Sequence, residues 1–142
     1  MKIGVRAHDY GKHSIEGLAS LLREEGYDGA QLALPKVFEE IDSYEDIRLS
    51  HIERIRRAFE KNRVEIPVMG CYMDLGNPDR SVREYAVETL KNCLLYAKEM
   101  GAGVVGTETA YPRLSREERA AWCPYMMDSL MRVMEEIGRA HV

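Results

Sequence analysis

The chain reads AKEMGAGVVGTET over residues 97–109, and this stretch says most about the fold. The residues up to Met100 continue the three-to-four spacing of an amphipathic helix. Gly101 suits the left-handed backbone that commonly ends such a helix. The apolar, β-branched run that follows predicts a strand over residues 103–107. The stretch is therefore a helix end that leads directly into a strand.

A second junction of this kind lies near the N-terminus, where residues 26–32 read GYDGAQL. Working outward from the two junctions, the chain alternates strand and helix four times. Apolar runs predict strands over 3–7, 30–34, 64–71 and 103–107. Helices are expected over 14–25 and 47–62, and after the capping boxes Ser81/Glu84 and Ser115/Glu118. Pro124 should kink or split the last helix.

Helical spacing also predicts which side chains are buried. In the first helix these are Ile15, Leu18, Ala19 and Leu22. In the second they are Ile52, Ile55, Ala58 and Phe59. In the last they are Met127, Leu130, Met131, Met134 and Ile137.

Parallel strands joined by helices form either an open doubly wound sheet or a closed barrel, and the pattern alone leaves both open. The usual markers of open nucleotide-binding sheets are missing. The one G-x-G-x-x-G match, at Gly101, Gly103 and Gly106, runs from a helix into a strand. Its amides therefore do not stand at a helix N-terminus, where a pyrophosphate binds.

Bulk properties exclude several classes of protein. A length of 142 residues fits one domain, and a net charge of -4 disfavours general affinity for nucleic acid or an anionic membrane. The three cysteines show no disulfide or zinc spacing. No segment approaches the ~20 apolar residues of a membrane span, and none reads as a signal peptide, so we expect a cytoplasmic protein.

The two junctions and the opening MKIGV, taken in succession, resemble the xylose isomerase-like sugar phosphate isomerase/epimerase family. The likeness runs to about residue 137. It implies a (β/α)8 TIM barrel, which needs about 250 residues. The expected fold class is therefore α/β, with four β/α units over residues 1–142 forming a single truncated half-barrel domain. The tail after residue 137 departs from the family, which indicates a truncated or split gene product.

The resemblance also implies a divalent metal, Mn, Mg or Zn, at the barrel mouth, and a sugar or sugar phosphate as substrate. In the family the metal ligands come from strands five to eight. We therefore expect this chain to lack the complete metal site, and its metal ligands stay unknown.

Functional side chains of such barrels gather at the carboxyl ends of the strands. Sugar isomerisation or epimerisation needs an acid and a base beside the substrate carbonyl, and this makes Glu108 the catalytic candidate. Loop capping or an arginine pair is the equal alternative for Glu108, as loop capping is for Asp74. The candidates for substrate binding are Arg6, His8, Tyr72, Asp74 and Thr107.

A four-stranded half-sheet leaves two edges of unpaired backbone groups, so we predict a homo-oligomer that closes the open half-barrel. Two other functions remain open. One is a non-catalytic oligomeric assembly or binding module. The other is a fragment of an endonuclease IV-like DNA repair enzyme, which the acidic composition disfavours.

Overall fold

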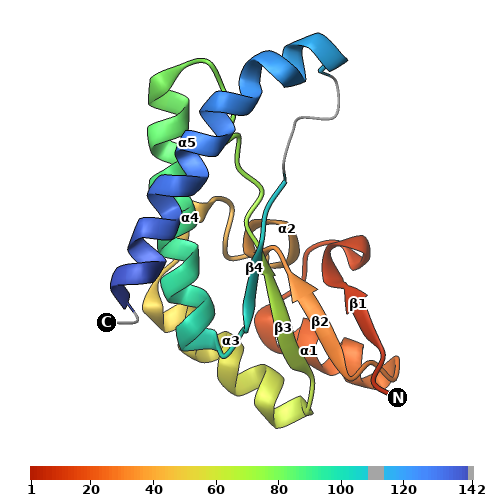
Figure 1. Ribbon diagram of the computed structural model, residues 1–142. Coiled ribbons are helices and arrows are strands. Elements are labelled where there is room, and N and C mark those ends of the chain that lie inside the picture. The colour runs from red at the N-terminus through yellow and green to blue at the C-terminus, as the bar shows by residue number, and fades with distance from the viewer. Residues whose placement is uncertain (109–113, 141–142) are drawn as a thin grey trace. The chain divides into compact units, whose positions relative to one another are not determined.

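The computed structural model describes residues 1–108 and 114–140 (Figure 1). The chain forms two compact units. Unit 1 comprises Met1–Gly70 and Leu94–Gly106, and unit 2 comprises Cys71–Cys93 and Thr107–Val142. Unit 1 holds the sheet, and unit 2 holds most of the last two helices.

The sheet of unit 1 has four parallel strands in the order of the chain. They are β1 (Gly4–Arg6), β2 (Gly29–Leu32), β3 (Glu65–Gly70) and β4 (Val104–Gly106), which lie side by side in Figure 1. Doubly wound open sheets reorder their strands, whereas a barrel keeps them in sequence. The predicted α/β class, with four β/α units forming half of a (β/α)8 TIM barrel, is confirmed.

Two helices of unit 1 bury the faces that their sequences predict. They are α1 (Ile15–Glu24) and α3 (Leu49–Asn62), which pack against each other. All eight predicted core side chains of these helices are buried. The short elements of this unit are η1 (Ala7–Tyr10), α2 (Leu34–Val37) and η2 (Tyr44–Asp46).

The two faces of the sheet differ in exposure. Leu32 and Met69 are paired in register and have no exposed surface. Arg6 pairs with Gln31 in the neighbouring row, which continues through Val68 to Val104. Val104 is 55% exposed although it is apolar. One face is therefore a packed core, while the other is open at its β4 end.

Helix ends in unit 1 follow the predicted turn chemistry. Gly26 and Gly101 have positive φ angles of 87° and 83°, so both helices end in left-handed glycines. The predicted second strand, 30–34, extends too far, because β2 ends at Leu32 and α2 begins at Leu34. Pro35 lies near the N-terminus of α2, where the N–H that proline lacks would have no partner within the helix.

The last two helices are α4 (Arg80–Met100), which spans both units, and α5 (Arg116–Ala140). The Ser115/Glu118 capping box is confirmed. The Ser115 N–H donates to Glu118 Oε2 at 2.7 Å, and the Glu118 N–H donates to Ser115 Oγ at 3.1 Å. The Ser81 capping box is wrong, because Asp79 Oδ1 accepts from both the Ser81 N–H and its hydroxyl.

Pro124 was predicted to kink or split the last helix, and α5 is one continuous helix with Pro124 inside it, so the helix is not split. Figure 1 shows that the helix changes direction in its N-terminal turns. In the described part of the chain, no helix has both the length and the apolar character needed to cross a bilayer.

The predicted buried side of α5 is wrong. Met127, Met131 and Met134 are 53–60% exposed, whereas Met126, Ser129 and Val133 are buried. The buried stripe contains a serine, whose hydroxyl is satisfied by a backbone carbonyl. Because Ser129 is polar, the spacing of apolar residues alone places the buried side of α5 on the methionines instead.

Candidate functional site

Arg6 and His8 follow one another at the carboxyl end of β1, in unit 1. The Arg6 guanidinium donates to both carboxylate oxygens of Asp9, with Nε–Oδ2 at 3.2 Å and Nη2–Oδ1 at 2.9 Å. This pairing holds the pKa of Asp9 below its usual range. More than half of the Arg6 side chain remains exposed, so a ligand can still reach its guanidinium.

His8 lies in η1 and is partly buried. Its pKa is below the ordinary value of 6.5, first because burial removes solvent and then because Arg6 and Lys36 are positively charged. The imidazole is therefore mainly neutral near pH 7, and it can donate and accept hydrogen bonds with a hydroxyl group.

The backbone fixes the surroundings of His8. The His13 N–H donates to the Val37 carbonyl at 2.9 Å, and the Glu39 N–H donates to the His13 carbonyl at 3.0 Å. These two bonds tie the loop after β1 to the end of α2, which carries Lys36. Arg6 on β1 and Lys36 on α2, the two positive charges near His8, therefore lie on elements that these backbone bonds connect.

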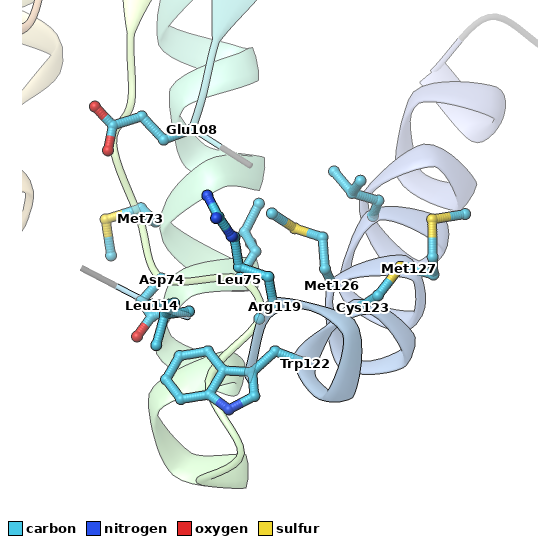
Figure 2. Close-up of a pocket in the computed structure, with 12 residues that line it drawn as sticks. Met73, Asp74, Leu75, Glu108, Leu114, Arg119, Trp122, Cys123, Met126 and Met127 are labelled. Carbon is cyan, nitrogen blue, oxygen red and sulfur yellow. The ribbon is translucent and has the colours of Figure 1, made fainter. Parts of the chain in front are cut away.

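Unit 2 contains a pocket of about 370 Å³, which is within the size range of small-ligand sites. Its walls come from the loop after β3, from Glu108 after β4, and from the N-terminal half of α5 (Figure 2). The charged groups in the lining are Asp74, Glu108 and Arg119, and the larger apolar ones are Met73, Leu75, Leu114, Trp122, Met126, Met127 and Leu130.

The three charged side chains of this pocket have different partners. Asp74 Oδ2 accepts a 2.7 Å hydrogen bond from the side-chain amide of Asn77, which is the loop capping that the sequence left as an alternative. Within residues 1–108 and 114–140, Glu108 and Arg119 have neither a hydrogen bond nor an ion pair through their side chains. Both are exposed, and both are available to a ligand.

Tyr72 and Thr107 lie outside the pocket lining. Tyr72 is half-buried. Thr107 Oγ1 is buried, and it has no hydrogen-bond partner among the residues that the structure describes. The structure thus brings together Asp74 and Glu108 in one pocket of unit 2, while Arg6 and His8 form a separate group in unit 1.

Arg119 and Trp122 also line the pocket, although neither was predicted as a site residue. A signal was present, because Trp122 is the only tryptophan of the chain. Arg119, Trp122, Met126 and Leu130 also follow a three-four-four spacing that places them on one side of α5. That side faces the pocket.

A metal of the kind that the family resemblance implies would need several converging ligands. No group of three His, Cys, Asp or Glu side chains with suitable geometry occurs among the described residues. The described residues therefore do not form a metal site by themselves.

A parallel sheet with strands in chain order, carrying polar side chains just after the strands, defines half of a (β/α)8 barrel. The chain belongs to the Xylose isomerase-like TIM barrel family, whose model matches residues 19–142. No curated protein matches the chain in sequence.

Solved structures agree on the fold. The chain is similar to 3-keto-D-glucoside 4-epimerase YcjR from E. coli, with 16% identity, a TM-score of 0.69, and coverage of 100% of this chain and 54% of that one. The chain is also similar to D-psicose 3-epimerase from Clostridium cellulolyticum H10, solved with D-tagatose. The identity is 12%, the TM-score is 0.69, and the match covers 96% of this chain and 50% of that one. A third similar structure is the probable 3-DHS dehydratase AsbF from Bacillus anthracis, with 14% identity, a TM-score of 0.67, and coverage of 96% of this chain and 49% of that one. This chain spans about half the length of these proteins.

Proposed function

We propose that the chain is the N-terminal half of a sugar or sugar phosphate isomerase or epimerase barrel, located in the cytoplasm. In this proposal it supplies substrate-binding side chains, and four further β/α units complete the catalytic centre. The observation that carries the proposal is the pocket of unit 2. Its lining contains Glu108 and Asp74, which follow consecutive strands, and Trp122, the sole tryptophan of the chain.

Glu108 is the proposed catalytic residue. Isomerisation or epimerisation removes a proton from a carbon next to a carbonyl and returns it elsewhere, which a carboxylate can do. In the described residues this carboxylate has no partner to neutralise it. Asp74 is a proposed sugar contact in unit 2, and Arg6 and His8 are proposed contacts in unit 1. Tyr72 and Thr107 stay proposed contacts without a place in the pocket lining.

The divalent metal that the resemblance implies would polarise the sugar oxygens. Because the described residues lack a cluster of metal ligands, the proposal assigns those ligands to the other half of the barrel. The expected consequence is that the chain binds sugars but turns none over on its own.

The proposed partner is a second copy of this chain. The sheet ends at β1 and β4, and both edges carry unpaired backbone groups that a neighbouring strand could satisfy. The exposed Val104 on β4 adds apolar surface at one of these edges. Two copies would supply eight strands and cover these edges, but a second copy would not supply the metal ligands assigned above to the other half of a complete family barrel.

The experiment is an assay of the purified chain with Mn²⁺, Mg²⁺ or Zn²⁺ against a panel of ketoses, aldoses and their phosphates. Calorimetry on the same samples measures sugar binding. We expect binding without turnover, and weaker binding by Glu108→Gln. Robust turnover by the chain alone would contradict the proposal that the chain holds only part of the catalytic centre. Absence of binding to every sugar would contradict the sugar function.

A second candidate is a non-catalytic assembly or binding module. The exposed methionines of α5, Met127, Met131 and Met134, favour it, because they form an apolar stripe at helical spacing. Met131 and Met134 lie outside the pocket lining, so replacing these two with Gln should dissociate an assembly without altering sugar binding. A loss of sugar binding with the assembly intact would argue against this role for the stripe.

A further inference from the structure

We propose that the pocket of unit 2 binds a neutral sugar ring, such as a glycoside, and discriminates against sugar phosphates. This inference rests on the proposed function, because it names the substrate class of the site that contains Glu108. It comes from two properties of the lining, its charge and its apolar surface.

Among the described residues, the charge of the lining is negative. Arg119 contributes one positive charge, whereas Asp74 and Glu108 contribute two negative charges. A phosphate monoester carries a charge of about -1.5 to -2 near pH 7. Bringing it into a pocket with an excess of carboxylates costs electrostatic energy that one guanidinium does not offset. A neutral ligand avoids this cost.

The apolar part of the lining matches a sugar ring. Figure 2 shows the indole of Trp122 and the guanidinium of Arg119 projecting from the start of α5, with Glu108 at the opposite end of the view. Aromatic rings provide large flat apolar surfaces, and the C–H face of a pyranose can pack on such a surface. Sugar hydroxyls can donate to Asp74 and Glu108 and accept from Arg119.

A more cationic cavity exists in unit 2, but its arginines are already engaged. It is lined by Arg80, Arg83 and Arg132, together with Glu84 and Asp128. Arg132 makes a two-bond pair with Glu84, and Arg83 donates to the carbonyls of Asn77 and Pro78. These bonds and the two carboxylates make this cavity a weak alternative for a phosphate group.

The single tryptophan gives a direct test. Emission of Trp122 is recorded while the chain is titrated with methyl β-D-glucopyranoside and, separately, with D-glucose 6-phosphate. We expect a saturable change with the glycoside, and roughly tenfold weaker binding of the phosphate because of the excess negative charge. Glu108→Gln should reduce this discrimination by removing one carboxylate.

Glu117→Gln is the matched control, because Glu117 is an exposed carboxylate outside the pocket lining, on α5, the helix that carries Arg119 and Trp122. Circular dichroism checks that each variant is folded. Trp122→Phe should bind the glycoside more weakly, and its binding is measured by calorimetry because this variant lacks the tryptophan fluorescence. Tighter binding of the phosphate, or equal effects of the two glutamate variants, overturns the inference but leaves the proposed sugar function standing. If neither sugar binds, both the inference and the proposed sugar function are overturned. Turnover by the chain alone overturns only the proposal that the chain holds part of the catalytic centre.

Discussion

The hydroxyl of Ser129 donates a 2.7 Å hydrogen bond to the backbone carbonyl of Leu75, and both residues are completely buried. The bond joins α5 to the loop after β3, across 54 positions of sequence. Leu75 lines the pocket of unit 2, as do Met126 and Leu130 on either side of Ser129 along the helix. The bond therefore fixes two walls of the pocket to each other.

Ser129→Ala should lower the free energy of unfolding by about 1–3 kcal/mol, because it leaves the Leu75 carbonyl buried without its donor. Urea unfolding followed by circular dichroism measures the change. Ser50→Ala is the control, since Ser50 is exposed on α3. If both variants lose the same small amount of stability, the buried hydrogen bond does not have this role.

Lys36→Gln should raise the pKa of His8. Burial, Arg6 and Lys36 all lower this pKa, and the substitution removes one of the two repelling charges. An NMR titration of the imidazole C–H resonances measures it. Lys61→Gln on α3 serves as the control, because Lys61 does not contribute to the shift. An unchanged His8 pKa in Lys36→Gln would show that the two side chains are not close in solution.

Protonation of His8 should destabilise the fold. Because its folded pKa is lower than the unfolded value near 6.5, the unfolded chain binds more protons between the two values. The free energy of unfolding should therefore fall as the pH decreases through that window. His8→Gln should flatten this part of the stability profile, and a profile identical to the parent's would exclude His8 as its source.

Arg54→Met should weaken the packing of α1 on α3. Arg54 donates to both oxygens of Glu16 at 2.6 Å and to Glu40 Oε2 at 2.6 Å, so one guanidinium connects three segments. All three side chains are partly exposed, and we expect a loss of ~0.5–1 kcal/mol in thermal unfolding. Arg57→Met tests the weaker 3.8 Å pair with Glu53, and an equal loss there would contradict the network.

The Arg54 contribution should depend on pH. Arg54 lowers the pKa of Glu16, so its stabilising effect is present above the unfolded pKa of a glutamate and is lost as the pH falls through the folded value. The difference in unfolding free energy between parent and Arg54→Met should shrink at low pH. A constant difference would mean that Arg54 acts through packing of its aliphatic stem.

The sequence predicted the parts of the fold in which local pattern and burial agree. The stripes of α1 and α3 are purely apolar on their buried sides, so their spacing identifies them. The buried side of α5 was missed because Ser129 lies in it, and its partner, the Leu75 carbonyl, is distant in sequence. No periodicity carries information about such a bond.

The candidate site was predicted only in part, for a related reason. Glu108 and Asp74 could be chosen because each follows a strand, and strand ends meet at one edge of a barrel. Arg119 and Trp122 come from the following helix, and their approach to the loop after β3 depends on tertiary packing. The lone tryptophan and the spacing of Arg119, Trp122, Met126 and Leu130 along one side of α5 were the local signals available.

The four strands form half of a barrel, and we infer that another four units must complete it. Light scattering coupled to size-exclusion chromatography of the 142-residue chain tests it most directly. We expect a particle of at least twice the 16.3 kDa chain mass, because the outer edges of β1 and β4 need neighbouring strands. A stable particle of one chain mass over the whole accessible concentration range would contradict it.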